Sequence, residues 1–336
     1  MNEKSKNTKQ TFFNVKNLHQ EFKVKTTGFF QANKIVKAVD GVSFTIEEGK
    51  VLGIVGESGC GKSSVAKSIL NIYPPKLGEV IFNEQNILKF SEKEWRKLRR
   101  DIQYIFQDPL GSLDPRMTII NQIIEPLIIH KIGDKKSRIS EALELLNSVG
   151  LTHEMAEKYP HELSGGQRQR VVLARALILK PKFIVCDEPV SALDVSIQAQ
   201  VILLLEKLKK EMNLTILFIS HDLSLVRYLC DNIAVMYLGK IVEQGPVESI
   251  YNNPKHPYTK ALMSAIPQSN PFSKKEPIVL NGEPPSPMNL PSGCRFHPRC
   301  WMANDSCANK EQELFETKQS YEHKFACHVM YEKELK

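Results

Sequence analysis

The octapeptide Gly56-Glu57-Ser58-Gly59-Cys60-Gly61-Lys62-Ser63 constrains this 336-residue chain more than any other stretch of its sequence. It matches the pattern GxxxxGK[ST] at every defined position. It also follows the apolar run Val51–Val55, which is typical of a buried parallel strand. Glycines let successive backbone N–H groups point at one anion, and a helix beginning near Lys62 adds the positive end of its dipole. The pattern therefore predicts a phosphate-binding loop between a strand and a helix of an α/β fold.

A bound nucleoside triphosphate gives each residue type in this loop a physical role. Lys62 is expected to neutralise the β- and γ-phosphates, and the Ser63 hydroxyl to hold Mg²⁺. The position of Cys60 is free in the pattern, so only its backbone N–H is needed. The expected nucleotide-binding residues are Gly56, Glu57, Ser58, Gly59, Cys60, Gly61, Lys62, Ser63 and Ser64.

A pair of carboxylates stands at the end of a second predicted strand, which runs over Phe183–Asp187. An aspartate at the tip of a buried strand beside the phosphate loop can hold Mg²⁺ through water, which is the role expected for Asp187. The adjacent Glu188 is expected to polarise the attacking water.

The segment Leu163-Ser164-Gly165-Gly166-Gln167 predicts a second anion-binding helix start. Ser164 is a suitable N-cap residue, and the two glycines leave backbone N–H groups exposed. One nucleotide does not need two such helix starts in the same chain.

Strand and helix patterns alternate along the first 258 residues, which predicts a core of parallel strands covered by helices. Residues 1–10 are expected to be a disordered tail, and about 92–170 a mostly helical subdomain. After about residue 254 proline becomes frequent, so this region is expected to wrap or link rather than to continue the sheet. The formal net charge of +7 is too diffuse to indicate nucleic-acid binding. No segment reaches the roughly 18 apolar residues that span a bilayer, and the first residues do not resemble a signal peptide, so a cytoplasmic location is expected.

Taken together, these motifs resemble the nucleotide-binding subunit of an ABC transporter. The resemblance covers about residues 12–258 and rests on residues 56–63, Gln107, residues 163–167, Asp187-Glu188, residues 191–194 and His221. It implies a P-loop NTPase core (an ABC ATPase cassette, residues 11–258) that binds and hydrolyses ATP with Mg²⁺. It implies that two subunits sandwich ATP head to tail, with the turn of Ser164, Gly165, Gly166 and Gln167 from one subunit meeting the γ-phosphate held by the other.

The resemblance also implies roles for three further residues. Gln107 would sense Mg²⁺ and water, His221 would contact the γ-phosphate, and Asp194 would link the two sites across the dimer. An aromatic ring is expected to stack on adenine, and Phe22 is the candidate, with Phe29 or Phe30 as alternatives.

Within that superfamily the chain is similar to the oligopeptide/dipeptide importer ATPases, a group that includes nickel importers. Three stretches carry this resemblance, namely residues 36–44, residues 105–118, and residues 256–262 followed by 293–300. It implies a second ATPase subunit in a heterodimer, two transmembrane permeases, an extracytoplasmic solute-binding protein, and a location on the cytoplasmic face of the membrane. Peptide import is the expected function, and import of nickel or another small solute is the alternative.

The predicted C-terminal extension, residues 259–336, is rich in proline and holds four cysteines, Cys294, Cys300, Cys307 and Cys327. Four thiolates at these spacings are compatible with an iron–sulfur cluster, with zinc, or with no ligand. The spacings are wider than the paired CxxC of zinc ribbons, which disfavours zinc. In the subfamily that this chain resembles, the pattern is associated with a [4Fe–4S] cluster.

Three other functions are disfavoured by single features. A soluble ABC-type ATPase of translation usually has two cassettes in one chain, and one of DNA repair separates the cassette halves by a long coiled coil. Neither applies here, since the chain has one cassette and Gln107 lies close to Ser164 in the sequence. A P-loop kinase would lack the segment 163–167, and a non-hydrolysing regulatory subunit would not need Glu188.

Overall fold

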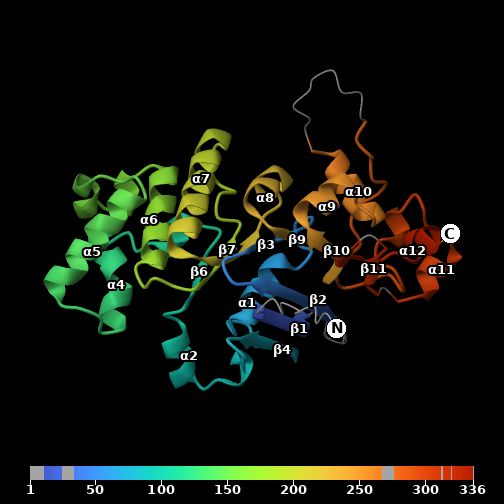
Figure 1. Cartoon of the computed structure of the whole chain (residues 1–336), viewed down its shortest axis with the longest axis horizontal. Coiled ribbons are helices and arrows are strands. Elements are labelled where there is room, and N and C mark those ends of the chain that lie inside the picture. Colours follow the sequence, from blue (N-terminus) through green and yellow to red (C-terminus); the bar gives the residue numbers. More distant parts are fainter. Residues whose placement is uncertain (1–10, 25–33, 267–275, 312, 319, 336) are drawn as a thin grey trace, which may run out of the picture.

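The computed structural model describes residues 11–24, 34–266, 276–311, 313–318 and 320–335. These residues form a small antiparallel sheet and a larger mixed sheet, with the helices gathered mainly on the far side of the larger one (Figure 1). The small sheet has the order β2-β1-β4-β5, with bounds Lys34–Glu47, Thr11–Val24, Leu77–Phe82 and Gln85–Asn86. The expected tail of residues 1–10 lies outside the described residues.

The larger sheet contains a parallel core flanked by antiparallel strands. Its order is β11-β12-β10-β9-β3-β8-β7-β6. The parallel strands are β9 (Asn232–Tyr237), β3 (Val51–Val55), β8 (Thr215–Ile219), β7 (Phe183–Asp187) and β6 (Ile102–Ile105). The antiparallel strands are β10 (Lys240–Pro246), β12 (Ser320–Phe325) and β11 (Phe315–Thr317). All residues of β3, β7 and β8 are buried, as parallel strands covered on both faces require.

The two faces of the parallel strands bury two different cores. Along β3, Val51 and Val55 pack with the core on the side of the helices, whereas Leu52 and Ile54 pack with the core shared with the small sheet. This split follows from the two-residue period of a strand, which sends successive side chains to opposite faces.

Local signals in the sequence explain where several helices begin. Ser91, Asp134 and Ser164 each cap a helix with the side chain and complete a capping box with the residue three positions later. The α-helices are α1 (Lys62–Ile69), α2 (Glu92–Leu98), α3 (Pro109–Ser112), α4 (Ile119–Ile129), α5 (Lys135–Ser148), α6 (Gly165–Leu177), α7 (Val195–Met212), α8 (Leu223–Leu229), α9 (Val247–Asn252), α10 (Pro257–Ser264), α11 (Asp305–Asn309) and α12 (His328–Leu335). The 3₁₀ turns are η1 (Ile87–Lys89), η2 (His153–Glu157), η3 (Pro160–Glu162) and η4 (His297–Arg299).

The region expected to be mostly helical, about 92–170, also contributes a strand to the central sheet. Strand β6 pairs in parallel with β7, from Ile102 opposite Phe183 to Ile105 opposite Cys186. Four residues are too few for periodicity to separate a strand from a helix. Helices α4, α5 and α6 do form a separate group, which is at the left of Figure 1.

The expectation that the chain after about residue 254 does not continue the sheet was wrong. Strand β12 pairs with β10 through Glu243 opposite Phe325, and β11 pairs with β12, so the C-terminal extension lengthens the sheet at one edge. The buried Glu243 carboxylate also lies 2.7 Å from Nε2 of His323, which attaches β12 to the cassette. The frequent prolines favoured an irregular region, but they lie before β11 in the sequence. They do not prevent strands from forming later in the chain.

The proposed boundary at residues 258 and 259 falls inside helix α10, so the fold does not break there. Among the described residues, no helix combines the length and apolar character that crossing a membrane requires.

Candidate functional site

The phosphate-binding loop closes tightly over the start of α1. Gly61 is the N-cap residue with φ 109°, and a Cβ at this position would lie 2.1 Å from the Ala38 carbonyl oxygen, so only glycine fits. Lys62 is 4% exposed, and its Nζ donates to the carbonyl oxygens of Gly56 (2.9 Å) and Glu57 (3.1 Å). The lysine ammonium is therefore held over the loop, where it can meet phosphate oxygens.

A hydroxyl and a carboxylate meet beside this loop at the end of β7. Ser63 Oγ donates to Asp187 Oδ1 at 2.9 Å, and the Tyr104 hydroxyl donates to Asp187 Oδ2 at 2.6 Å. Burial, followed by the charge of Asp187, raises the pKa of Tyr104 far above its usual range, so this phenol stays a donor. Two hydroxyl groups thus orient the carboxylate of Asp187, a residue that is only 3% exposed.

Glu188 connects three of the residues singled out from the sequence. Its Oε2 accepts from Gln107 Nε2 at 3.1 Å and lies 3.2 Å from His221 Nδ1, while its Oε1 is 3.9 Å from Lys62 Nζ. Its backbone has φ 46°, a conformation that is uncommon outside glycine. The structure thus brings together Lys62, Ser63, Gln107, Asp187, Glu188 and His221 from loops at the carboxyl ends of parallel strands.

The turn that begins at Ser164 lies apart from the phosphate-binding loop of the same chain. Ser164 is exposed, caps α6, and pairs with Gln167 in a capping box. A Cβ on Gly166 would lie 2.5 Å from Ile197, so the turn packs against the start of α7, the helix that Asp194 precedes. The residues lining the cavity at the phosphate-binding loop include Lys62, Gln107 and Glu188 but none from 164–167.

The aromatic candidate Phe22 is not among the residues that line this cavity. Its ring packs edge-on against Tyr73 with a centroid distance of 5.4 Å. The cavity is lined instead by Val36, Lys37 and Ala38 of the neighbouring strand β2. Phe29 and Phe30 fall outside the described residues.

The four C-terminal cysteines lie close enough for the charges of their thiols to interact. All four are free thiols, and Cys294 N–H donates to the Cys307 carbonyl at 2.7 Å. Burial, together with the charges of the other three thiols, raises the pKa of Cys294 to about 12. Among the described residues, however, no three His, Cys, Asp or Glu side chains are arranged to hold one metal ion.

Sequence reasoning missed three residues that contact this site. Tyr104 holds Asp187, and two residues from the C-terminal part of the chain, Tyr258 and Arg299, contact Glu57 of the phosphate-binding loop. Tyr104 lies three positions before Gln107 on a strand that carried no clear signal. Contacts across more than 200 positions have no signature in a single sequence.

Comparison with known proteins identifies the family. Residues 39–191 match the family model described as ABC transporter, and residues 242–307 match the model described as Oligopeptide/dipeptide transporter, C-terminal region. The chain is 48% identical over 323 residues to the oligopeptide transport ATP-binding protein AppF of Bacillus subtilis, covering 95% of this chain and 98% of that protein. It is 48% identical over 313 residues to OppF of Escherichia coli, another oligopeptide transport ATP-binding protein, covering 92% and 93%.

A solved structure agrees with this relationship. The ATP-binding cassette MJ0796, in a dimeric post-hydrolysis state bound to ADP and phosphate, superposes with a TM-score of 0.62 at 31% identity, covering 70% of this chain and 99% of that one. The expected ABC ATPase cassette and the expected ATPase activity are therefore confirmed. The chain belongs to the ATP-hydrolysing subunits of the ABC transporter family, in the branch defined by the oligopeptide/dipeptide transporter C-terminal region.

Proposed function

We propose that this chain uses its ATPase activity to energise the import of oligopeptides or dipeptides across the cell membrane. One observation carries the choice of cargo. Residues 242–307 match the oligopeptide/dipeptide transporter region and lie outside the catalytic motifs. Both relatives described above are oligopeptide transport ATP-binding proteins, and the similarity covers almost their whole length.

Uptake measurements in the source organism test this proposal. Deleting the gene should abolish uptake of labelled di- or oligopeptides, and a plasmid copy should restore it, while nickel uptake should stay at the parental level. Loss of nickel uptake with intact peptide uptake would contradict the proposal in favour of the nickel alternative.

The residues around Asp187 suit Mg²⁺. A hydroxyl and a carboxylate 2.9 Å apart are hard oxygen ligands, and this ion needs only one or two protein ligands because phosphate oxygens and water complete its octahedron. Bound there, the ion neutralises charge that develops on the phosphates. Ser63 and Asp187 would hold it, with Gln107 contributing through its side-chain oxygen.

Glu188 is the proposed base-like residue that polarises the attacking water. Its carboxylate accepts from Gln107, lies near His221 Nδ1 and is 3.9 Å from Lys62 Nζ, and these contacts support water activation next to the γ-phosphate position expected near Lys62. Replacing Glu188 by Gln should reduce turnover by about 10²-fold or more and leave ATP binding intact. Unchanged turnover would remove Glu188 from this role.

The exposed Ser164 turn is proposed to complete the ATP site of a second cassette subunit. Support comes from its absence from the lining of the cavity of its own chain and from its packing against Ile197 at the start of α7, the helix that Asp194 precedes. Glu188→Gln protein mixed with ATP should form a dimer in solution by light scattering, either alone or with the expected second ATPase subunit. Monomers under both conditions would contradict this arrangement, and the two mixtures separate a homodimer from the expected heterodimer.

A groove between the sheet and the helical group is the proposed docking surface for a permease on the cytoplasmic face of the membrane. Its lining includes Trp95, Arg99, Tyr104, Phe106, Glu125 and Arg175. Phe106 of this lining and Leu110 of α3, four positions further on, are 44% and 55% exposed, as apolar residues that meet a partner are expected to be. A short cytoplasmic helix of the permease with apolar and acidic side chains would suit this mixture of aromatic rings and guanidinium groups.

A matched pair of substitutions tests the docking surface. Leu110→Asp should leave ATP hydrolysis by the isolated subunit intact but abolish transport by the assembled importer. Leu203→Asp places the same charge on a leucine of α7 that is equally exposed (54%), and it should leave both activities intact. Equal transport by the two variants would count against docking near Gln107.

We further propose that Cys294, Cys300, Cys307 and Cys327 bind a [4Fe–4S] cluster. The thiols of Cys300, Cys307 and Cys327 lie close enough to act on the charge state of Cys294, which is compatible with one shared ligand, and spacings wider than the paired CxxC of zinc ribbons favour a cluster over zinc. Anaerobic purification should give a brown protein with iron and absorbance at about 400 nm. A colourless, iron-free protein would exclude the cluster.

A further inference from the structure

The C-terminal part of the chain touches the phosphate-binding loop directly, through Glu57. The backbone N–H of Glu57 donates to the Tyr258 hydroxyl at 2.8 Å. The Glu57 carboxylate accepts from two nitrogens of Arg299, with Nη1 2.9 Å from Oε2 and Nη2 3.1 Å from Oε1. The backbone N–H and the carboxylate of Glu57 are thus both held by residues more than 200 positions away in the sequence.

The surroundings keep Arg299 in place. Its side chain is 7% exposed, and its Nη1 also lies 3.4 Å from the hydroxyl oxygen of Tyr237. Burial by itself lowers the pKa of this guanidinium, but the hydrogen bonds and charge of Glu57 outweigh burial and raise it. Below it, the rings of Tyr237, Tyr258 and Phe296 pack together with centroid distances of 4.7 to 5.4 Å.

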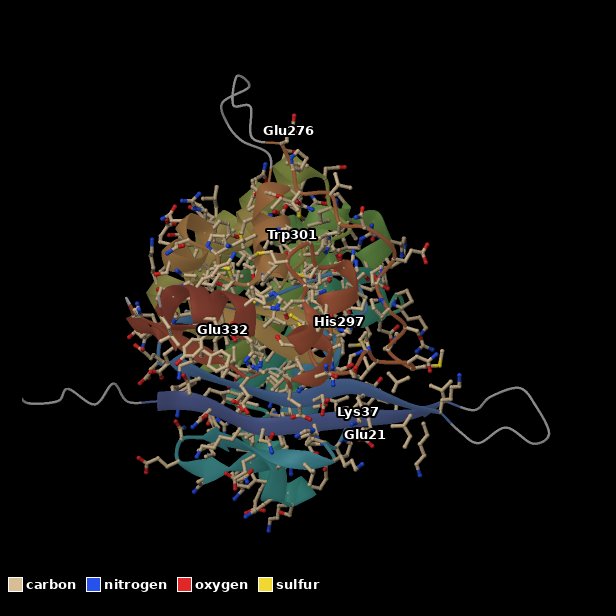
Figure 2. All side chains as sticks on the ribbon, turned by 90° about the vertical axis from the view of Figure 1, so that its right-hand side faces the viewer. Glu21, Lys37, Glu276, His297, Trp301 and Glu332 are labelled. Carbon is tan, nitrogen blue, oxygen red and sulfur yellow. The ribbon has the colours of Figure 1, made fainter. Side chains whose placement is uncertain are left out.

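The neighbouring Arg295 makes a second connection in the same direction. It donates to the Asp40 carboxylate of β2 and to the Leu238 carbonyl, beside the Gly239 that hydrogen-bonds to the loop at the Cys60 carbonyl. Figure 2 shows this side of the molecule, with His297 of η4 above the strands that carry Glu21 and Lys37. The segment 294–300 therefore lies against the nucleotide site and not at the periphery of the fold.

The charge of Glu57 gives this contact a consequence for ATP binding. A carboxylate within a loop that must bind a triphosphate repels the ligand unless a cation neutralises the carboxylate. Arg299 supplies that cation, and two of its guanidinium nitrogens donate to the two carboxylate oxygens. At a partly buried site the repulsion is screened less than in water.

We propose that Arg299 is a positioning residue of the ATP site. It neutralises and orients Glu57, and together with Tyr258 it couples the order of the segment 294–300 to nucleotide binding. The proposal rests on ATP binding by the loop and is independent of the cargo and of the permease. Because coupling is reciprocal, ATP must stabilise the segment to the same extent that the segment favours ATP.

Substitutions at both ends of the ion pair separate an electrostatic role from simple packing. Arg299→Gln should weaken binding of a non-hydrolysable ATP analogue with Mg²⁺ by on the order of tenfold, which corresponds to ~1.4 kcal/mol. The double variant Glu57→Gln/Arg299→Gln should recover most of the lost affinity, because the unpaired carboxylate is gone. Arg227→Gln removes an arginine that forms a similar two-bond pair with Glu248 at the surface, and it should bind within about twofold of the wild type.

Two results would overturn the proposal. One is an Arg299→Gln variant that binds the analogue as tightly as the wild type. The other is a double variant as weak as Arg299→Gln or weaker, which indicates lost packing. A wild-type protein that does not bind the analogue at all would instead contradict the ATPase assignment.

Hydrogen exchange on the wild-type chain tests the reciprocal effect without any substitution. The analogue should slow exchange of the backbone amides of residues 294–300, and this protection should be lost in Arg299→Gln at saturating analogue. If nucleotide leaves exchange of this segment unchanged in the wild type, the coupling does not exist.

Discussion

Replacing Tyr104 by Phe removes one atom from the site and tests how Asp187 is held. The lost hydroxyl donates to Asp187 Oδ2 at 2.6 Å, while Ser63 still donates to the other oxygen. Phenylalanine keeps the ring and its edge-on contact with Phe106, whose centroid lies 4.5 Å away. The substitution therefore isolates one hydrogen bond to a nearly buried carboxylate.

The magnitude follows from the charge of the acceptor and from burial. A hydrogen bond to a charged group contributes ~1.5–3 kcal/mol, and a buried acceptor left without its donor gives the upper part of this range. Because Asp187 is 3% exposed, water cannot replace the phenol, and we expect Tyr104→Phe to lower the free energy of unfolding by ~2 kcal/mol. ATP turnover should also fall, since Asp187 is the proposed Mg²⁺ ligand.

Urea unfolding without nucleotide, together with the Mg²⁺ dependence of ATP hydrolysis, measures both effects. Tyr228→Phe is the matched control, because its hydroxyl donates to Glu206 at 2.7 Å on a ring that is 54% exposed, and its loss should be much smaller. Equal stability of the two variants, with equal Mg²⁺ dependence, would refute the reasoning that burial makes the Tyr104 bond important.

Three further outcomes follow from the structure. Burial raises the pKa of the Cys60 thiol, so maleimide should label this thiol more slowly at about pH 7 than a free cysteine. Mg²⁺ with ATP should slow the labelling further. Rapid labelling that does not respond to nucleotide would contradict the position of Cys60 in the loop. Burial lowers the pKa of His256 to about 3, so the unfolded chain binds more protons below about pH 6.5 and stability falls as pH falls, by ~2 kcal/mol between pH 6.5 and 5. His256→Asn retains a cap for the Tyr258 N–H and should reduce that pH dependence in urea unfolding; an unchanged slope would point to another group. Gly61→Ala should abolish nucleotide binding, since its Cβ would meet the Ala38 carbonyl; normal binding would show that the loop relaxes.

Much of the site could be predicted because its residues lie next to strong local signals. The apolar runs that became β3, β7 and β8 place Gly56, Asp187 and His221 at or just after the ends of parallel strands. The carboxyl ends of parallel neighbours meet at one edge of a sheet, so these residues had to converge. Ser164, a suitable N-cap residue followed by two glycines, likewise predicted the start of α6, where the structure completes a capping box with Gln167.

Other features were invisible because they depend on contacts between distant segments. The pairing of β12 with β10, which overturned our expectation for the C-terminal region, joins short strands about 80 positions apart. Phe22 packs against Tyr73 and does not line the cavity at the phosphate-binding loop. Which aromatic residue stacks on adenine therefore stays a prediction.

By itself, the sequence determined the chemistry of this protein: a glycine loop, a lysine and two carboxylates at strand ends allow few functions other than binding and splitting a triphosphate. Only the tertiary structure decided that the C-terminal segment belongs to that site. The physical reason is that a motif records which groups lie on one strand, turn or helix, whereas the pairing of Glu57 with Arg299 exists only after the sheet has brought two remote segments into contact.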